Sequence, residues 1–388
     1  MHSFSAWAEI DLSAIEHNLR VISSIISPKT KVMAVVKADG YGHGAVPISK
    51  FLLNKGIEFF GVARIEEAIE LREGGISVPI LILGYTPFDQ IKEAIEYNLI
   101  QTLYTKEQAR DFANVCKKMG KRLKCHIKVD TGMGRLGFVA ISQNTINKTV
   151  EDIEEIKRIK ELDVEGIFTH FAKADSDKEY TELQLRRFLD LLDRLEKRGI
   201  TFSIRHAANS AGLIHFPKAH LDMVRPGIML YGVYPSQESK KLIRLKQVMT
   251  LKAKVAMVKE VGPGFCVSYG STYATSSSTK LATVSIGYGD GYPRALSSKG
   301  KMLIKGRKVK VVGRVCMDYT VVDVGDLDVK IGDEVIVFGE DGCENISVEE
   351  IAKQCNTIGY EILTGITKRV KRLYKYKNNL KSYLPMFS

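Results

Sequence analysis

Apolar and polar positions divide the first 235 residues into short apolar runs and longer amphipathic stretches. The amphipathic stretches, for example 64–73, 107–119 and 179–197, have the period expected of helices that bury one face. Eight apolar runs separate such stretches: 31–37, 59–63, 79–85, 100–104, 125–130, 166–171, 204–208 and 223–231. Strands that alternate with helices favour a parallel sheet. Eight units in about 230 residues predict an α/β fold, a (β/α)8 TIM-like barrel over residues 1–240.

A different pattern begins near residue 245. Short β-branched runs at 255–258, 281–286, 308–312, 319–324 and 334–338 are separated by Gly and Asp, and no helix-length segment precedes 348–354. We therefore predict a mainly β C-terminal domain over residues 241–388, joined to the barrel through the polar segment 233–241. The pattern leaves open whether the first few residues pack with this second domain.

The composition is that of a globular protein. Of 388 residues, 45% are hydrophobic and 26% are charged, which excludes disorder, collagen and coiled coil for the whole chain. The formal net charge is +12, but residues 1–243 hold 34 basic and 31 acidic residues, against 23 and 14 in residues 244–388. Seven basic residues and no acidic residue lie among the last 21: Lys368, Arg369, Lys371, Arg372, Lys375, Lys377 and Lys381. We interpret this run as a solvated basic terminus and expect no nucleic-acid partner.

No feature of the sequence predicts export or membrane insertion. The start lacks a basic segment followed by an apolar run, and the most apolar stretch, 78–85, is too short for a transmembrane helix. The six cysteines show no CxxC spacing and are interpreted as reduced thiols. We therefore expect a cytoplasmic protein without a membrane partner.

The residues at the predicted strand ends indicate a cofactor. Lys37 ends an apolar strand, so its desolvated amine would deprotonate easily and could form a Schiff base. Gly-containing turns at 209–212 and 226–228 lie where many barrels bind phosphate. A lysine that can form a Schiff base with an aldehyde, together with a phosphate site, suggests pyridoxal phosphate. Arg225 could be the partner of its pyridine nitrogen. Taken singly, each feature also has an ordinary explanation, a solvent-reaching lysine or a simple turn.

Seven segments in order along the chain carry a resemblance to a known family. They are AVVKADGYGHG (34–44), KVDTGMGRLG (128–137), HAANSA (206–211), VRPGIMLYG (224–232), VSYGSTY (267–273), SIGYGDGYPR (285–294) and GRVCMD (313–318), preceded by WAEIDL (7–12). Together they closely resemble the bacterial alanine racemase family, and the resemblance covers nearly the whole chain. It implies pyridoxal-phosphate-dependent racemisation of L- and D-alanine, which supplies D-alanine for peptidoglycan.

The resemblance also implies roles for individual residues. Lys37 would carry the cofactor and act as a base on one face of the substrate Cα, with Tyr269 as the base on the opposite face. His170 and Arg225 would support Tyr269. Cofactor phosphate contacts would come from Tyr41, Ser210, Gly227, Ile228 and Tyr360.

Substrate contacts and assembly follow from the same resemblance. Arg135 and the backbone N–H of Met317 would bind the substrate carboxylate, and Lys128 matches a position that is carbamylated in several members. A narrow entryway would be formed by Asp175, Tyr288, Arg294 and Arg314. The second domain would complete the active site of the other subunit in a homodimer, and no metal is implied.

Four other functions stay open at this stage. The chain could be a different pyridoxal enzyme on the same two-domain plan, or a pyridoxal-phosphate-binding protein without turnover, although such proteins resemble the barrel alone. A basic nucleic-acid binder lacks support from any basic face interleaved with aromatic residues. A metal hydrolase using His170 and His206 lacks carboxylate ligands at neighbouring strand ends.

Overall fold

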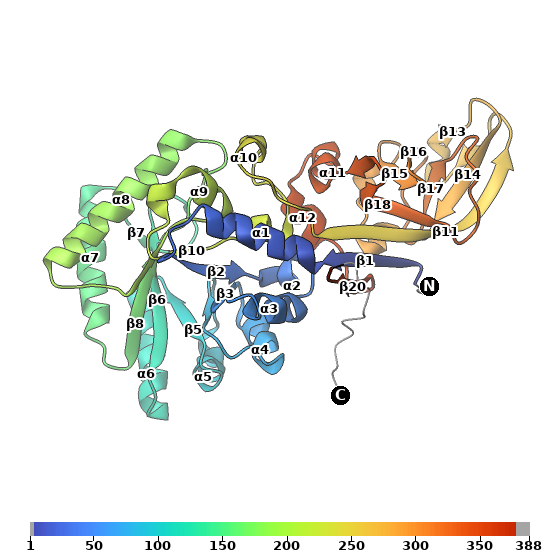
Figure 1. Cartoon of the computed structure of the whole chain (residues 1–388). Coiled ribbons are helices and arrows are strands. Elements are labelled where there is room, and N and C mark those ends of the chain that lie inside the picture. Colours follow the sequence, from blue (N-terminus) through green and yellow to red (C-terminus); the bar gives the residue numbers. More distant parts are fainter. Residues whose placement is uncertain (1–3, 378–388) are drawn as a thin grey trace.

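Two large sheets carry the fold in the computed structural model, which describes residues 4–377 (Figure 1). In the first sheet all neighbouring strands are parallel, in the order β10-β2-β3-β4-β5-β6-β8-β9, with the short β7 (Phe138–Val139) beside β6. The strands are β2 (Lys31–Val35), β3 (Phe59–Val62), β4 (Ile80–Ile82), β5 (Ile100–Leu103), β6 (Leu123–Asp130), β8 (Leu162–Phe168), β9 (Ile204–His206) and β10 (Met223–Val224). Backbone hydrogen bonds bridge β9 and β10, Asp222 N–H to Arg205 O (3.1 Å) and Arg225 N–H to Ala208 O (2.9 Å). The predicted eight-stranded barrel is therefore confirmed.

Helices surround this barrel, because each buries an apolar face against the strands. In α6 (Lys106–Met119), for example, Ala109, Phe112, Ala113 and Cys116 recur at helical spacing and are buried. Thr105 caps this helix by accepting the N–H of Gln108. The other helices of the barrel domain are α1 (Leu12–Ser24), α3 (Ala45–Leu53), α4 (Ile65–Glu73), α5 (Ile91–Glu96), α7 (Gln143–Lys157), α8 (Lys178–Lys197) and α9 (Ser210–His215). The short element α2 (Lys37–Tyr41) contains left-handed residues and is a turn rather than a regular helix.

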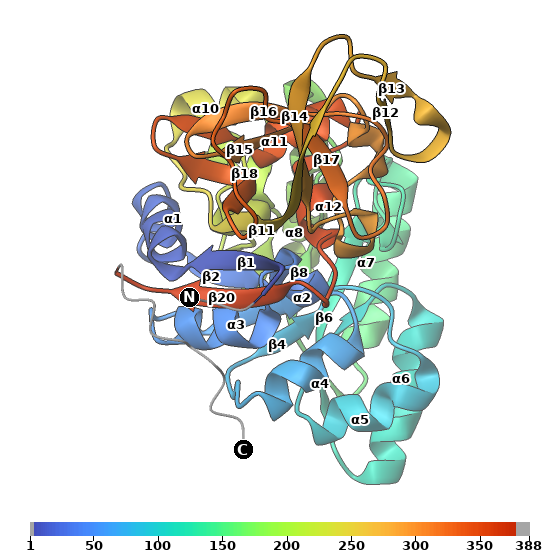
Figure 2. The ribbon, with the colours of Figure 1, turned by 90° about the vertical axis from the view of Figure 1, so that its right-hand side faces the viewer.

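The second sheet forms the mostly β C-terminal domain, which Figure 2 shows from its own side. Its strand order is β19-β18-β15-β16-β17-β14-β11-β1-β20 within the described residues. The strands are β1 (Ala6–Asp11), β11 (Met249–Val261), β14 (Thr279–Val284), β15 (Lys301–Ile304), β16 (Arg307–Val311), β17 (Thr320–Asp323), β18 (Glu334–Asp341), β19 (Glu344–Ile346) and β20 (Lys371–Lys375). The described part of the chain after the barrel also contains a two-stranded pair, β12 (Cys266–Val267) and β13 (Tyr273–Ala274), and the helices α10 (Gln237–Leu242), α11 (Val348–Gln354) and α12 (Gly359–Thr364). The expected mainly β second domain is confirmed, although the exact boundary at residue 240 stays a prediction.

Two expectations about the barrel strands were wrong. The run 31–37 does not end in a strand residue at Lys37, because β2 stops at Val35 and the backbone then turns into a left-handed segment. The run 223–231 forms only a two-residue strand, β10, because Pro226 cannot donate a ladder hydrogen bond. The apolar residues Ile228–Tyr231 form a 3-10 turn instead. An apolar run of this length does not by itself distinguish a strand from a buried turn.

The basic run at the end of the chain is not a solvated terminus as far as residue 377. Residues 371–375 form β20, which pairs in parallel with β1, and the first strand therefore belongs to the second sheet. Arg369 makes ion pairs with Asp290 (2.9 Å) and Asp318 (2.7 Å). Arg372 donates to four backbone carbonyls. Lys381 lies outside the described residues.

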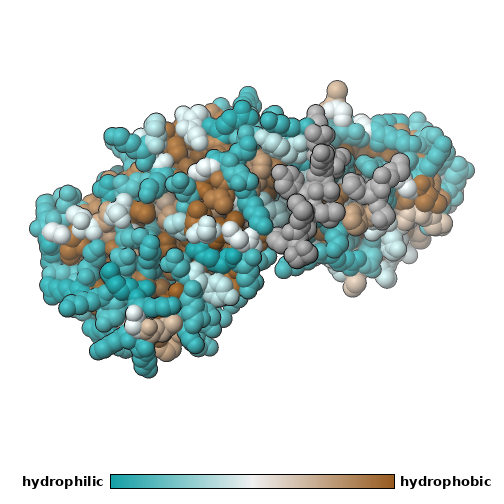
Figure 3. Space-filling view, turned by 60° about the horizontal axis from the view of Figure 1, so that its bottom comes forward, coloured by the Kyte–Doolittle hydropathy of each residue, from teal (hydrophilic) through white to brown (hydrophobic). Residues whose placement is uncertain are grey.

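Most of the face seen in Figure 3 is hydrophilic, interrupted by apolar residues over the barrel and near the end of the second domain. Between residues 4 and 377, no helix combines the length and the apolar character needed to cross a membrane.

Candidate active site

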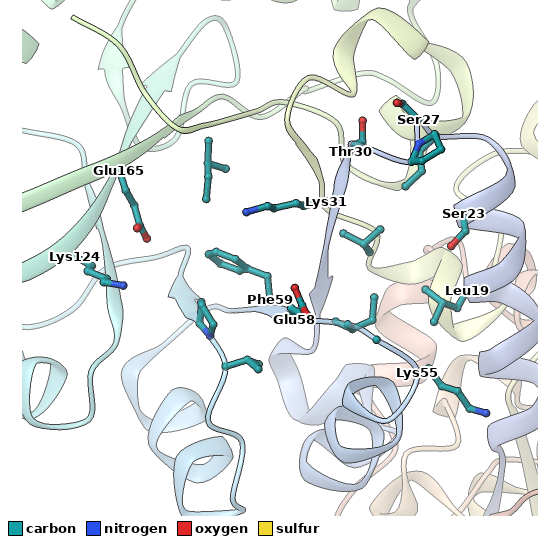
Figure 4. A pocket seen from close by; sticks show the side chains of 18 residues that line it. Leu19, Ser23, Ser27, Thr30, Lys31, Lys55, Glu58, Phe59, Lys124 and Glu165 are labelled. Atoms are coloured by element: carbon teal, nitrogen blue, oxygen red, sulfur yellow. The ribbon is translucent and has the colours of Figure 1, made fainter.

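A cavity of about 310 Å³ opens at the carboxyl ends of the barrel strands, where chemistry is found in barrels of this type. The structure brings ten of the sequence-predicted residues to its lining: Lys37, Tyr41, Lys128, Arg135, His170, Ser210, Arg225, Gly227, Ile228 and Tyr360. A cavity of about 610 Å³ at the opposite end of the barrel is larger but contains none of these ten residues (Figure 4). The chemistry of the lining, and not the volume, therefore identifies the candidate site.

Lys37 enters the cavity from an unusual turn. Ala38, Asp39, Gly40 and Tyr41 all have φ between 52° and 61°, so four successive residues are left-handed. Such a backbone persists only where its surroundings hold it in place. The Glu67 carboxylate accepts the N–H of Ala38 (2.6 Å), and Asp39 Oδ1 accepts the N–H of Ala45 (2.9 Å).

The last described strand also fixes this turn. From β20, Arg372 donates to the carbonyl of Gly42 (3.0 Å) and Tyr374 Oη donates to the carbonyl of His43 (2.9 Å). The Tyr374 hydroxyl occupies the space that a Cβ at residue 44 would need, which explains Gly44. Sequence reasoning missed Arg372 and Tyr374 as site-supporting residues, since their contacts are to backbone carbonyls about 330 residues earlier in the chain.

Two lysines in the cavity have weakened basicity. Burial lowers the pKa of Lys37, and the nearby charge of Arg135 lowers it further. Burial and the charges of Arg135 and Arg225 lower the pKa of Lys128 to about 8. Both amines are therefore closer to a neutral, nucleophilic form at physiological pH than an exposed lysine would be.

One end of the cavity is rich in neutral donors. Burial raises the pKa of Tyr41, and burial raises the pKa of Tyr360 to about 12, so both phenols keep their protons. The Ser210 hydroxyl lies 3.0 Å from the Gly227 N–H. A Cβ at Gly227 would overlap the Tyr41 hydroxyl, so only glycine admits this arrangement. Phenol, hydroxyl and backbone donors in a cavity whose lining contains no carboxylate suit a phosphate group.

Arg225 occupies the floor of the cavity and is buried. Its guanidinium donates to His206 Nδ1 (2.9 Å), His170 Nδ1 (3.3 Å) and the carbonyls of Thr169 (2.8 Å) and Ala207 (2.9 Å). Burial lowers the pKa of Arg225 to about 9, which still leaves it charged at neutral pH. Burial and this positive charge hold the pKa of His170 well below its usual range, so His170 is neutral.

Arg135 is presented by a loop after β6 that Asp130 organises. The Asp130 carboxylate accepts the backbone N–H groups of Gly132, Met133, Gly134 and Arg135 at 2.8–3.2 Å. Arg135 lines the cavity and is exposed, and no carboxylate lies among the other lining residues. A guanidinium in this position can bind a carboxylate.

Six predicted site residues do not line the cavity. Asp175, in the barrel domain, is exposed, although its charge is close enough to act on Tyr360. The other five lie in the second domain: Tyr269, Tyr288, Arg294, Arg314 and Met317. Tyr269 is 69% exposed and follows β12, which pairs with β13 at the end of the second domain remote from the barrel (Figure 1).

Four of these second-domain residues are close together. Gly270, next to Tyr269, lies against the Arg314 guanidinium, and the backbone N–H of Tyr288 donates to Cys316 O (3.0 Å) beside Met317. Arg369 links the segments that contain Tyr288 and Met317, because it forms ion pairs with Asp290 and Asp318. The second domain thus presents a group of candidate residues, three of them exposed, that do not line the barrel cavity of the same chain.

We expect stability to decrease at acidic pH because of buried histidines. Burial lowers the pKa of His43 to about 4 and also lowers the pKa of His126 and His206. The unfolded chain therefore binds more protons than the folded one below about pH 6.5. Each such histidine costs about 1.4 kcal/mol of unfolding free energy per pH unit from there down to its folded pKa.

Urea unfolding at pH 8, 6.5 and 5.5 measures this loss. Replacement of the buried His43 by Asn should reduce the change in the free energy of unfolding per pH unit. An equal free energy of unfolding at pH 8 and 5.5 would contradict the prediction.

Among residues 4–377, no three His, Cys, Asp or Glu side chains come close enough to hold a metal ion. The barrel cavity combines lysine amines, an anion-binding end and a buried arginine, and a β domain follows the barrel. These features define a two-domain, cofactor-dependent enzyme.

Comparisons with known proteins identify the family. Residues 10–235 match the family model "Alanine racemase, N-terminal domain", and residues 248–374 match "Alanine racemase, C-terminal domain". The alanine racemase of Desulforamulus reducens is 50% identical over 371 residues, which cover 95% of this chain and 98% of that protein. The chain belongs to the alanine racemase family, and it is an amino-acid racemase, an isomerase.

Solved structures agree. The alanine racemase of Clostridium difficile 630 superposes with a TM-score of 0.92 at 41% identity, covering 98% of each chain. That of Bartonella henselae, described with covalently bound pyridoxal phosphate, has a TM-score of 0.85 at 34% identity, covering 96% of this chain and all of that one. The family is pyridoxal-phosphate-dependent, and relatives of this name support alanine racemisation as the reaction.

Proposed function

We propose that this enzyme interconverts L- and D-alanine by a two-base mechanism, with pyridoxal phosphate held by Lys37. The observation that carries the proposal is the convergence, in one cavity, of a lysine with a lowered pKa, a set of neutral phosphate donors and a buried arginine. Each of these groups has a partner in the cofactor: its aldehyde carbon, its phosphate and its pyridine nitrogen.

The residues of the cavity fit this cofactor. Tyr41, Ser210, Tyr360 and the backbone of Gly227 and Ile228 would hold the phosphate, and Lys37 Nζ would attach to the aldehyde. When bound, pyridoxal phosphate withdraws electrons from the substrate Cα and makes its proton acidic. Because Arg225 only donates, it would hydrogen-bond to an unprotonated pyridine nitrogen.

Racemisation requires a base on each face of the Cα. In our proposal Lys37 Nζ moves the proton on one face and the Tyr269 hydroxyl moves it on the other. His170 Nδ1 accepts from Arg225, so the neutral ring has its proton on Nε2. That N–H can donate to the Tyr269 oxygen and stabilise its deprotonated form.

The substrate carboxylate would bind to Arg135 and to the backbone N–H of Met317. Lys128, whose pKa of about 8 leaves an appreciable neutral fraction, is suited to carbamylation. A carbamate there would replace one of several crowded positive charges with a negative charge that orients Arg135.

The proposal includes a homodimer with shared sites. The Tyr269 and Met317 side chains are 69% and 52% exposed in one chain, and neither lines its own barrel cavity. A second copy would place them over the cavity of the partner. Asp175, Tyr288, Arg294 and Arg314 would then form the entryway. Bulky tyrosines on both sides would restrict the site to small substrates.

Borohydride reduction followed by peptide mapping tests this function. The isolated enzyme should absorb visible light, and the reduced cofactor should be found on Lys37 alone. A colourless, fully active enzyme, or a label on another lysine, would refute the proposal. Colour without racemisation would favour the alternative of a binding protein. A cytoplasmic location and a role in peptidoglycan synthesis stay predictions from the sequence.

A further inference from the structure

A line of polar side chains crosses the barrel interior from Arg225 to its opposite end. Arg225 contacts His206 Nδ1 (2.9 Å), and His206 Nε2 contacts His126 Nδ1 (2.9 Å). His126 Nε2 lies 3.7 Å from Glu165 Oε1. Both histidines are fully buried, and Phe168 stacks on the His206 ring at 4.7 Å and 9°. The four groups thus join the cavity at the carboxyl ends of the strands to the other end of the barrel.

The N–H groups in this line all point in one direction, from Arg225 towards Glu165. A guanidinium has no acceptor, so His206 Nδ1 must accept from Arg225. Burial lowers the pKa of both histidines, and neutral His206 therefore carries its proton on Nε2 and donates to His126 Nδ1. The proton of His126 is consequently on Nε2. No polar atom of residues 4–377 lies within hydrogen-bond distance of that nitrogen, which leaves the Glu165 carboxylate at 3.7 Å to attract it.

The backbone is built around this pair. Cys125 pairs with Val164 and His126 with Gly166, so Glu165 is the extra residue of a β-bulge. Bulges often redirect a side chain near an active site. A Cβ at Gly166 would overlap the His126 ring, so this glycine makes room for it.

The far end of the line lies in the larger cavity, at the beginnings of the barrel strands. Figure 4 shows the Glu165 side chain in this cavity with Lys124 and Lys31 nearby. The His126 ring, and then the charges of Lys124 and Lys31, hold the pKa of Glu165 below its usual range despite partial burial. Glu165 is therefore an ionised acceptor that is 24% exposed to solvent.

We propose that Glu165, acting through His126, is a positioning residue for Arg225. It stabilises the Nε2–H tautomer of both histidines, and an imidazole acceptor thereby faces the guanidinium at the cofactor end of the barrel. The effect on catalysis rests on the proposed function, whereas the tautomers do not. Without the carboxylate there are two outcomes, and both are unfavourable. Either His126 keeps a buried Nε2–H that has no acceptor, or the ring protons of both histidines move to Nδ1. In the second case the Nδ1–H of His206 faces an N–H of Arg225.

Imidazole ¹⁵N chemical shifts test the tautomers in the isolated wild-type protein. Protonated and unprotonated ring nitrogens are readily distinguished, and both His206 and His126 should carry the proton on Nε2. A proton on Nδ1 of either ring overturns the proposal. This measurement requires no turnover. The tautomer proposal can therefore be wrong while the proposed racemase function is correct, and the proposed function can be wrong while the tautomers are as proposed.

Three variants test the consequence. Glu165→Leu should disturb the tautomers, change the absorption spectrum of the bound cofactor and lower kcat about ten-fold, with KM for alanine within about two-fold of wild type. Glu165→Gln retains an oxygen acceptor and should restore most of kcat. Glu58→Leu removes an exposed acidic side chain from the same cavity and should behave as wild type.

Unchanged tautomers and kcat in Glu165→Leu, or equal impairment in the Gln and Leu variants, would overturn the proposal. If the Leu variant does not fold, the wild-type tautomers and the Gln variant still decide it.

Discussion

Lys37→Ala is expected to abolish racemisation, with kcat/KM lower by about 10³-fold or more. The substitution removes both the covalent attachment of the cofactor and the proton carrier on one face of the substrate. The visible absorbance of the purified protein should change as well, because the cofactor would be held only by the phosphate site and Arg225. Racemase rates and absorption spectra of wild type and variant measure both effects.

Lys92→Ala is the matched control. Lys92 is an exposed lysine on α5 that pairs only loosely with Glu96, at 3.8 Å, so its loss should affect neither rate nor spectrum. If Lys37→Ala retained more than about a tenth of the wild-type rate, Lys37 could not be one of the two bases.

Tyr269→Phe should slow proton exchange unequally for the two enantiomers. Only one face of the Cα depends on this hydroxyl, so the exchange with solvent deuterium of one enantiomer should fall about 10²- to 10⁴-fold. The exchange of the other enantiomer, served by Lys37, should fall much less. Deuterium incorporation into L- and D-alanine, followed by mass spectrometry at early times, measures the asymmetry.

Tyr319→Phe serves as the control, since Tyr319 is also exposed in the second domain and has no assigned role. Small and equal losses for both enantiomers in Tyr269→Phe would show that Tyr269 is not a base.

The sequence predicted the barrel because its strands are nearly continuous apolar runs separated by helical patterns. β3, β5 and β6 begin within two residues of their predicted positions. It failed where an apolar run does not form a strand. Beyond β10, residues Ile228–Tyr231 are buried in a turn, and burial alone gives the same pattern as a strand.

Long-range pairing was the other limit. β1 and β20 lie at opposite ends of the chain yet are neighbours in one sheet. Nothing local in the basic sequence of β20 indicates that Arg372 donates to carbonyls of the Lys37 segment. The count of basic residues therefore led to the wrong prediction of a solvated terminus, because Arg369 and Arg372 make ion pairs and hydrogen bonds within the fold. Contacts to backbone carbonyls depend on geometry and not on the identity of the residue that accepts.

The candidate site was largely predictable, because its chemistry depends on residue types at strand ends. The residues predicted to hold the cofactor line one cavity: Lys37, Tyr41, Ser210, Arg225, Gly227, Ile228 and Tyr360. The side-chain chemistry did not indicate the supports behind them, such as Glu67 at the Lys37 turn and Glu165 behind His126. Those depend on a left-handed turn and on a β-bulge.

Hybrid dimers test the central claim, that Lys37 of one subunit acts with Tyr269 of the other. Mixing Lys37→Ala and Tyr269→Ala subunits at random gives about half hybrid dimers, each with one intact and one doubly impaired site. The account predicts recovery of about a quarter of wild-type activity from two inactive variants. No recovery in verified hybrid dimers would contradict it, because two bases from the same subunit cannot be complemented in this way.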